Sequence, residues 1–173
     1  MFPKAHAAAY VMMAWRIAYC KVFYPLAYYA AFFSIRATSF NYELMCQGKE
    51  RLEHHMHDYE SRKDTLSKKE QDTYKDMRIV QEMYARGFEF MPIDIYRAQA
   101  HHFQIIDDKL MPSISTIDGL GDKAADAVVD GPFLSRDDFR QRTKVSKTVI
   151  DLMAELKLLG DLPESNQLSL FDL

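Results

Sequence analysis

The chain has 173 residues, of which 48% are hydrophobic and 13% aromatic, enough apolar material for one medium domain or two small ones, so wholesale disorder is not expected. The formal net charge of −3 excludes no class of partner, because the charges are unevenly distributed. No Asp or Glu precedes Glu43, whereas Lys4, Arg16, Lys21 and Arg36 do. This basic, acid-free opening indicates a surface that faces an anionic partner.

Membrane insertion is not expected from the apolar opening. Its longest uncharged run, residues 22–35, has 14 residues and contains Pro25, whereas a spanning helix needs about 20. A secretory signal is not expected either, because charges interrupt the stretch and no small-residue cleavage site follows it. Cys20 and Cys46 show neither metal-ligand spacing nor a disulfide framework. Reduced, partly buried thiols in a cytosolic protein are the favoured interpretation, and a disulfide between them is the weaker alternative.

The first half of the sequence predicts four helices, at about residues 5–23, 25–37, 41–60 and 67–86. The first is rich in Ala, Met and aromatic residues and has no Gly or Pro, so we expect it to be largely buried. Pro25 ends it and suits the first turn of the second helix. Asn41 is expected to cap the third helix, Ser67 opens the fourth, and Gly87 closes it.

Beyond Gly87 the pattern changes to short aromatic and branched segments. FEFMPIDIYRA and HHFQIID predict strands, and DKLMPSIS predicts a third, short extended piece. After Ser115 short helices return. The sequence therefore predicts a mainly α fold with a few short strands (α+β), a domain boundary near Gly87 and a flexible tail without helical periodicity.

The segment STIDGLGDKAADAVV resembles the hairpin of a helix-hairpin-helix DNA-binding motif. Gly119 and Gly121 allow backbone angles closed to other residues and let the main chain approach a phosphate. The amides at the start of the following helix then point at the anion. Leu120 is expected to anchor the hairpin in the core, and Lys123 to add a charge-assisted contact. A simple helical turn with two glycines is the alternative.

A second, weaker hairpin is indicated at QRTKVSKT, where Lys144, Ser146 and Lys147 are the candidate DNA-binding residues. Residues 136–147 contain five basic and two acidic residues, a local charge of +3, which suits contact with a phosphate backbone. An ordinary solvated basic surface is the alternative. Two such hairpins in tandem would grip both strands of a duplex.

A metal site at His54, His55 and His57 is the less favoured interpretation of that stretch, because no Cys or acidic cluster completes a ligand set at suitable spacing. A polar helix surface is favoured instead. The sequence contains no nucleophile–base pair and no carboxylate pair that indicates a catalytic site. We therefore expect neither a metal site nor catalytic residues in this chain.

The opening MFPKAHAAAYVMMAWRIAYCKVFYPLAYYAAFF closely resembles the fingers domain of bacterial C-family replicative polymerases. It is most similar to the PolC-type DNA polymerase III alpha subunit of low-GC Gram-positive bacteria. The residues that carry the resemblance are Phe2, Lys4, His6, Tyr10, Lys21 and Pro25. The order of a strand pair, a helix-hairpin-helix region and a terminal QLSLF is also similar, so the resemblance covers the whole chain. The second hairpin departs from it, with Thr143 where a glycine is usual, and the link VVDGPFLS is short.

This resemblance implies three regions. Residues 1–87 would be the carboxy-terminal part of the fingers, residues 88–160 the strand pair and the helix-hairpin-helix duplex-binding region, and residues 161–173 a tail with a sliding-clamp-binding motif. The residues implied to face the incoming nucleotide are Lys4, His6, Tyr10 and, as a weaker candidate, Arg16. The residues implied to bind the clamp are Gln167, Leu168, Ser169, Leu170 and Phe171.

The resemblance further implies a part of a replicative DNA polymerase, a nucleotidyltransferase of DNA replication. Mg²⁺ would assist the parent reaction and would be held by palm carboxylates outside this chain, so the chain alone is expected to bind no cofactor and to be inactive. The implied partners are duplex DNA without sequence preference, incoming dNTP in the full enzyme and the beta sliding clamp, in the cytoplasm with the nucleoid and without a membrane. A non-catalytic adaptor that recruits the clamp, and the error-prone C-family relative, are the alternatives.

Overall fold

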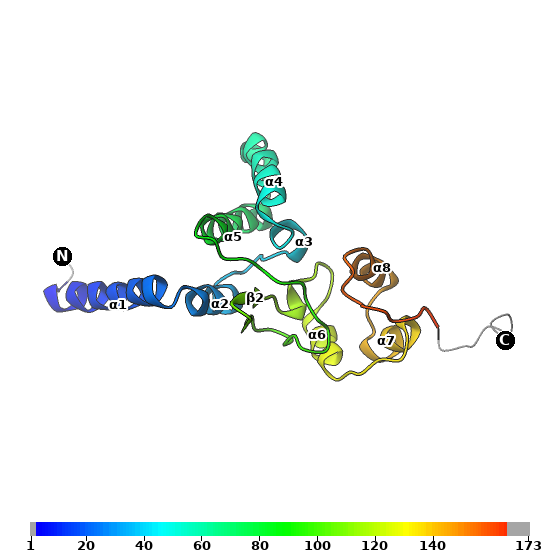
Figure 1. Ribbon diagram of the computed structural model, residues 1–173. Helices are drawn as coiled ribbons and strands as arrows, with labels where there is room; N and C mark the ends of the chain where they lie inside the picture. Colours follow the sequence, from blue (N-terminus) through cyan, green and yellow to red (C-terminus); the bar gives the residue numbers. More distant parts are fainter. Residues whose placement is uncertain (1–2, 166–173) are drawn as a thin grey trace, which may run out of the picture.

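The computed structural model describes residues 3–165 and is mainly helical, with one two-stranded antiparallel sheet (Figure 1). This confirms the predicted α+β class. The helices are α1 (Lys4–Phe23), α2 (Pro25–Ile35), α3 (Tyr42–Met45), α4 (Lys49–Ser61), α5 (Lys68–Ala85), α6 (Asp122–Val129), α7 (Arg136–Thr143) and α8 (Lys147–Glu155). The strands are β1 (Gln104–Ile106) and β2 (Lys109–Met111). Among residues 3–165, no helix is long and apolar enough to cross a membrane.

Helix α1 forms where it was predicted, but the expectation that it is largely buried was wrong. None of its residues is buried, and it projects from the rest of the molecule (Figure 1). It is held at its last turns, where Lys21 Nζ lies 2.7 Å from Glu82 Oε2 of α5 and Arg86 donates to the carbonyl of Lys21. Apolar composition shows what a helix can bury, whereas burial requires neighbouring segments. The thiol of Cys20, expected to be partly buried, is exposed with the helix.

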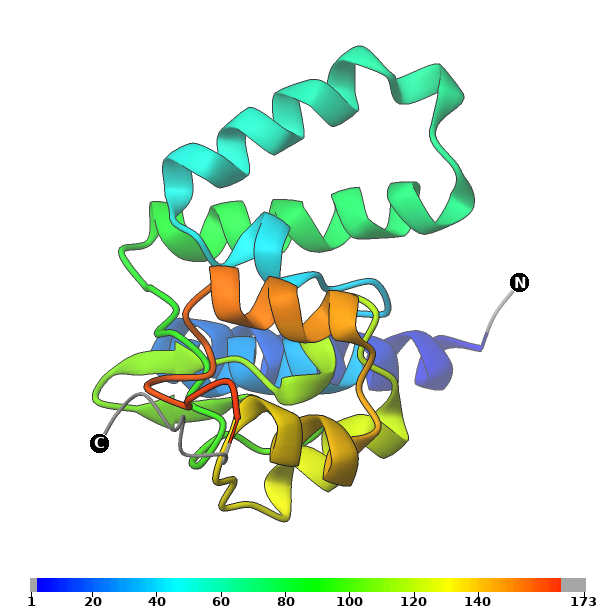
Figure 2. The same cartoon turned by 90° about the vertical axis from the view of Figure 1, so that its right-hand side faces the viewer.

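The predicted third helix is two helices. Asn41 caps the short α3, with its side chain accepting from the amide of Leu44. Gly48 then has a φ of +97°, which is incompatible with a continuous right-handed helix, so α4 begins anew after it. Ser67 opens α5 as predicted, in a capping box with Glu70. Helices α4 and α5 form an antiparallel hairpin (Figure 2).

The two strands form in the second and third of the predicted extended segments, and the first segment forms none. FEFMPIDIYRA forms no regular strand; it contributes a single parallel bridge between Phe90 and Leu110. Pro92 has no amide proton to continue a ladder, and the chain turns at Asp94, whose carbonyl accepts from Ala98. HHFQIID does supply β1, and DKLMPSIS supplies β2 with Ile105 opposite Leu110.

Two hydrophobic clusters build the core. One lies among α2, α3, α4 and α5, and includes Phe90, Phe103 and Leu110 from the segment that follows. The other fills the space between α6, α7 and α8, with Leu120 and Phe139 among its members. This second cluster also contains Tyr42 of α3 and Ile93 and Ile95 of the segment after α5, so the hairpin region shares its core with neighbouring elements. The domain boundary near Gly87 stays a prediction.

Candidate nucleic-acid interface

The first hairpin connects a short 3-10 turn (Ile114–Thr116) to α6. The amide of Leu120 donates to the carbonyl of Ile117, at 3.2 Å, which closes a tight turn and places the Leu120 side chain in the core. Gly119 occupies the left-handed region, with a φ of +77°, whereas Gly121 has an ordinary φ of −76° and forms the N-cap of α6. The expectation that both glycines need angles closed to other residues was therefore right for Gly119 and wrong for Gly121.

Gly119 is also required by packing. A Cβ at this position would lie 3.0 Å from Cγ2 of Val149, in the first turn of α8. Real Cβ atoms are rarely this close to a neighbour, so a side chain here would require Val149 to shift by a few tenths of an ångström. No heavy atom lies within 4 Å of a Cβ built on Gly121. The missing side chain of Gly119 thus lets the two hairpins meet, and that of Gly121 leaves the start of α6 open.

The start of α6 presents unsatisfied donors. The amides of Ala124 and Ala125 both donate to the carbonyl of Gly121, at 2.9 and 3.0 Å. In the part of the chain that the structure describes, the amides of Asp122 and Lys123 meet no acceptor. Such amides, aligned with the helix dipole, favour an anion. The arrangement can therefore receive a phosphate, and the contact of these amides with DNA stays a prediction.

The second hairpin has the same backbone course as the first. Lys144 occupies the left-handed region with a φ of 59°, Val145 is buried next to it, and Ser146 caps α8 by accepting from the amide of Val149. Thr143, where a glycine is usual, is buried, and its hydroxyl donates to the carbonyl of Phe139 at 2.7 Å. The departure from the family pattern therefore does not prevent the hairpin from forming. Sequence patterns gave no sign that Lys144 takes the left-handed position.

The basic residues of the two hairpins differ in the contacts that their side chains make. Lys123, Lys144 and Lys147 are exposed, and no acidic side chain among residues 3–165 lies within ion-pair distance of them. Arg142, by contrast, donates to the carbonyl of Asp130 and lies over the ring of Phe133, 4.8 Å from its centroid. The local excess of positive charge thus includes a residue that holds the link between α6 and α7.

The candidates for facing a nucleotide lie along α1. His6 and Tyr10 are one turn apart with ring centroids 4.5 Å from each other, and Tyr10 is 67% exposed. Arg16 lines an apolar groove of about 840 Å³ between α1 and α2, and Lys4 stands at the exposed start of the helix. The described residues do not bring these four side chains together into one pocket.

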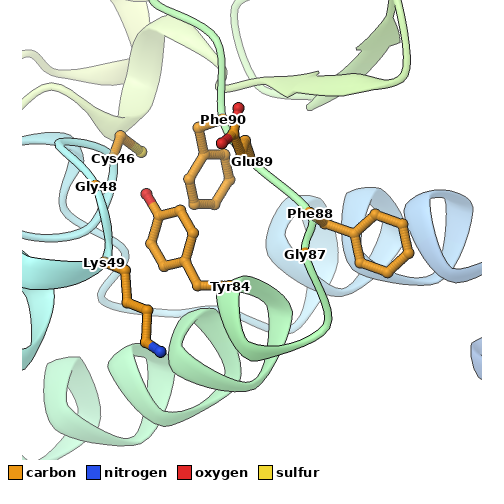
Figure 3. Close-up of a pocket in the computed structure, with 8 residues that line it drawn as sticks. All are labelled: Cys46, Gly48, Lys49, Tyr84, Gly87, Phe88, Glu89 and Phe90. Carbon is orange, nitrogen blue, oxygen red and sulfur yellow. The ribbon is translucent and has the colours of Figure 1, made fainter.

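A pocket of about 410 Å³ between α5 and the segment that follows it shows no catalytic arrangement (Figure 3). Its Tyr84 hydroxyl donates to the carbonyl of Met45, and burial raises the pKa of this phenol. Burial also raises the pKa of the Cys46 thiol well above its usual value, which makes it a poor nucleophile. Within residues 3–165 no three His, Cys, Asp or Glu side chains, His54, His55 and His57 included, form a group that could hold a metal ion.

The start of the tail is fixed to α7. The amide of Arg136 donates to the carbonyl of Pro163, at 2.8 Å, and that of Asp137 to the carbonyl of Glu164, at 3.1 Å. Leu162 packs against the core of the hairpin region. The predicted clamp-binding residues 167–171 lie outside the described residues.

Comparison with known proteins agrees with this geometry. A family model described as a helix-hairpin-helix motif matches residues 87–168. This part of the chain contains both hairpins. The chain is 45% identical to the PolC-type DNA polymerase III of Caldanaerobacter subterraneus subsp. tengcongensis and 48% identical to that of Streptococcus pneumoniae (strain R6), in each case over 99% of the chain. The protein of the same description from Clostridium perfringens is 45% identical.

The chain is therefore similar over nearly its whole length to one part of the PolC-type DNA polymerase III proteins. It spans 12% of the length of these relatives. The family resemblance drawn from the opening, the hairpin and the terminal motif is confirmed.

Proposed function

We propose that this chain is the carboxy-terminal part of a replicative DNA polymerase and that it binds duplex DNA through its two hairpins. The observation that carries the proposal is their shared backbone course, with a left-handed residue, a buried anchor and a helix N-cap in each, packed together at Gly119 and Val149. The match to a helix-hairpin-helix family model supports it.

The proposed contact is with the phosphate backbone. The amides of Asp122 and Lys123 receive one phosphate at the start of α6, and the start of α8 receives another. Lys123, Lys144 and Lys147 add charge-assisted contacts. Contacts of this kind position a duplex and carry no base information, so the affinity depends on salt and not on sequence.

In the parent protein we propose template-directed DNA synthesis, supported by the descriptions of the relatives. Lys4, His6, Tyr10 and Arg16 of α1 would face the incoming dNTP. The Mg²⁺ ions would be held by palm carboxylates outside this chain, as the resemblance to C-family polymerases implies. The isolated chain is then inactive, and primer extension by the purified 173 residues would contradict this.

We further propose that residues 167–171 bind the beta sliding clamp, and that the protein acts in the cytoplasm with the nucleoid. The tail would leave the hairpin region from α7, to which Pro163 and Glu164 are hydrogen-bonded. Leu170→Ala with Phe171→Ala should abolish capture of the clamp in a pull-down, and Asn166→Ala with Asp172→Ala, just outside the motif, should not. Equal capture by both variants would exclude the assignment.

The duplex-binding proposal is tested by fluorescence anisotropy with two labelled duplexes of equal length and unrelated sequence, titrated at several salt concentrations. We expect the same affinity for both, with log K falling by about 0.9 per phosphate contact for each unit of log salt. A strong preference for one duplex, or an affinity independent of salt, would overturn the proposal.

A further inference from the structure

The first hairpin has more negative than positive charge around its proposed phosphate site. Three carboxylates flank the proposed phosphate site, because Asp118 precedes Gly119 and both Asp122 and Asp126 lie on α6. Their side chains are 61%, 87% and 65% exposed. Carboxylates this close to a phosphate repel it, and Lys123 is the single basic residue between 118 and 126.

Residues from outside the hairpin approach these carboxylates from two sides. Lys69, in the first turn of α5, places its Nζ 3.8 Å from Oδ1 of Asp118. His101, in the loop before β1, has its Nε2 2.9 Å from Oδ1 of Asp126 and its Nδ1 4.0 Å from Oδ1 of Asp122. Each of the three carboxylates therefore has one partner that the hairpin does not supply.

These contacts are poorly suited to stabilising the fold. The side chains of Lys69 and Asp118 are 77% and 61% exposed, and ion pairs in this setting contribute little to stability because water and salt screen them. Their position next to the unsatisfied amides of α6 gives them a different consequence. A cation on a carboxylate lowers the local negative potential where the phosphate has to approach.

We propose that Lys69 and His101 are positioning residues for duplex binding: Lys69 offsets the charge of Asp118, and His101 holds the carboxylate of Asp126 through a hydrogen bond. Both residues lie outside the hairpin, in α5 and in the loop before β1, so these two segments would strengthen the binding of DNA by the hairpin. The inference rests on the proposed duplex-binding function of the first hairpin.

The test is a pair of double-mutant cycles in the full 173-residue chain, with duplex affinity as the readout. Lys69→Ala should weaken binding by about threefold, the scale of one exposed charge pair, and Asp118→Asn should strengthen it. In the Asp118→Asn background, Lys69→Ala should have little effect. Lys75→Ala is the matched control, because Lys75 is another exposed lysine of α5 and is paired with Asp72 at 2.7 Å; its affinity should equal that of the unchanged chain.

The second cycle joins His101 and Asp126. His101→Ala should weaken binding, His101→Gln should restore part of it because the amide can still donate to Asp126, and Asp126→Asn should remove the effect of His101→Ala. The midpoint of urea unfolding should stay the same throughout the series. Additive effects in both cycles would overturn the inference while the unchanged chain still binds duplex. Absence of duplex binding by the unchanged chain would instead contradict the proposed function on which it rests.

Discussion

The two hairpins reach the same backbone course with different residues. In the first, Gly119 takes the left-handed position and a side chain there would meet Val149 closely, because Cγ2 of Val149 lies 3.0 Å from the site of a Cβ. In the second, Lys144 takes that position with an exposed side chain. The comparison shows that the left-handed angle alone does not demand glycine. At Gly119 the close contact with Val149 is a second reason for glycine. At Lys144 the side chain is exposed, so this reason does not apply.

The two hairpins would also bind a phosphate backbone through different groups. The first offers open amides among carboxylates, and the second offers two exposed lysines, Lys144 and Lys147, around a Ser-capped helix. We therefore expect the first to depend on main-chain geometry and the second on charge. Binding measurements on variants of Gly121 and of Lys144 with Lys147 separate the contribution of main-chain geometry from that of charge.

The buried anchors should show the largest effects. Leu120→Ala should lower the free energy of unfolding by about 2–4 kcal/mol, since it leaves a cavity in the hydrophobic cluster of the hairpin region. Val145→Ala removes fewer buried atoms and should cost about 1.5 kcal/mol. Urea unfolding of both variants measures the difference. A larger loss for Val145→Ala would mean that the second hairpin, and not the first, is the better packed.

Substituting the residue with the left-handed backbone conformation should change stability in opposite directions in the two hairpins. Gly119→Ala should cost about 1–2 kcal/mol for the unfavourable angle, with a further loss from the contact with Val149. Lys144→Gly should instead raise stability by up to about 1 kcal/mol, because glycine accepts this angle without strain. Thermal unfolding of both variants measures it, and destabilisation by Lys144→Gly would show that its side chain makes a contact that matters.

Removing the lysines of the second hairpin should change the salt dependence of binding. Lys144→Ala with Lys147→Ala should reduce the slope of log K against log salt by about 1.8, or about 0.9 for each lost phosphate contact. Arg51→Ala with Arg78→Ala removes the same charge from exposed positions on α4 and α5 and serves as the control. An equal change of slope in the control would mean that net charge alone governs binding.

Local signals predicted much of this fold. Ser67 with Glu70, Asn41 and Pro25 mark helix starts through contacts within a few residues, and the structure confirms all three. The Gly-Leu-Gly of residues 119–121 likewise predicted the first hairpin. The exposure of α1 was missed, because burial depends on neighbours that a helix does not encode.

The residues that complete the site were missed for a related reason. Lys69 meets Asp118, and His101 meets Asp126, 25 residues further along. No local pattern reports such a pair, because the fold alone brings its members together. Lys144 was predicted as a basic contact, but its left-handed backbone has no signature when glycine is absent.

The most direct test of the account is the effect of Gly121→Val on duplex affinity and stability together. Gly121 has an ordinary φ and open space around it, so the variant should stay folded and lose only about 1 kcal/mol, the cost of a poor N-cap residue. A branched side chain at this N-cap would nevertheless narrow the open approach to the amides that begin α6. We predict a clear loss of duplex affinity, by about tenfold for one lost charge-assisted contact. Unchanged affinity in a stably folded Gly121→Val variant would contradict the claim that this hairpin holds the phosphate.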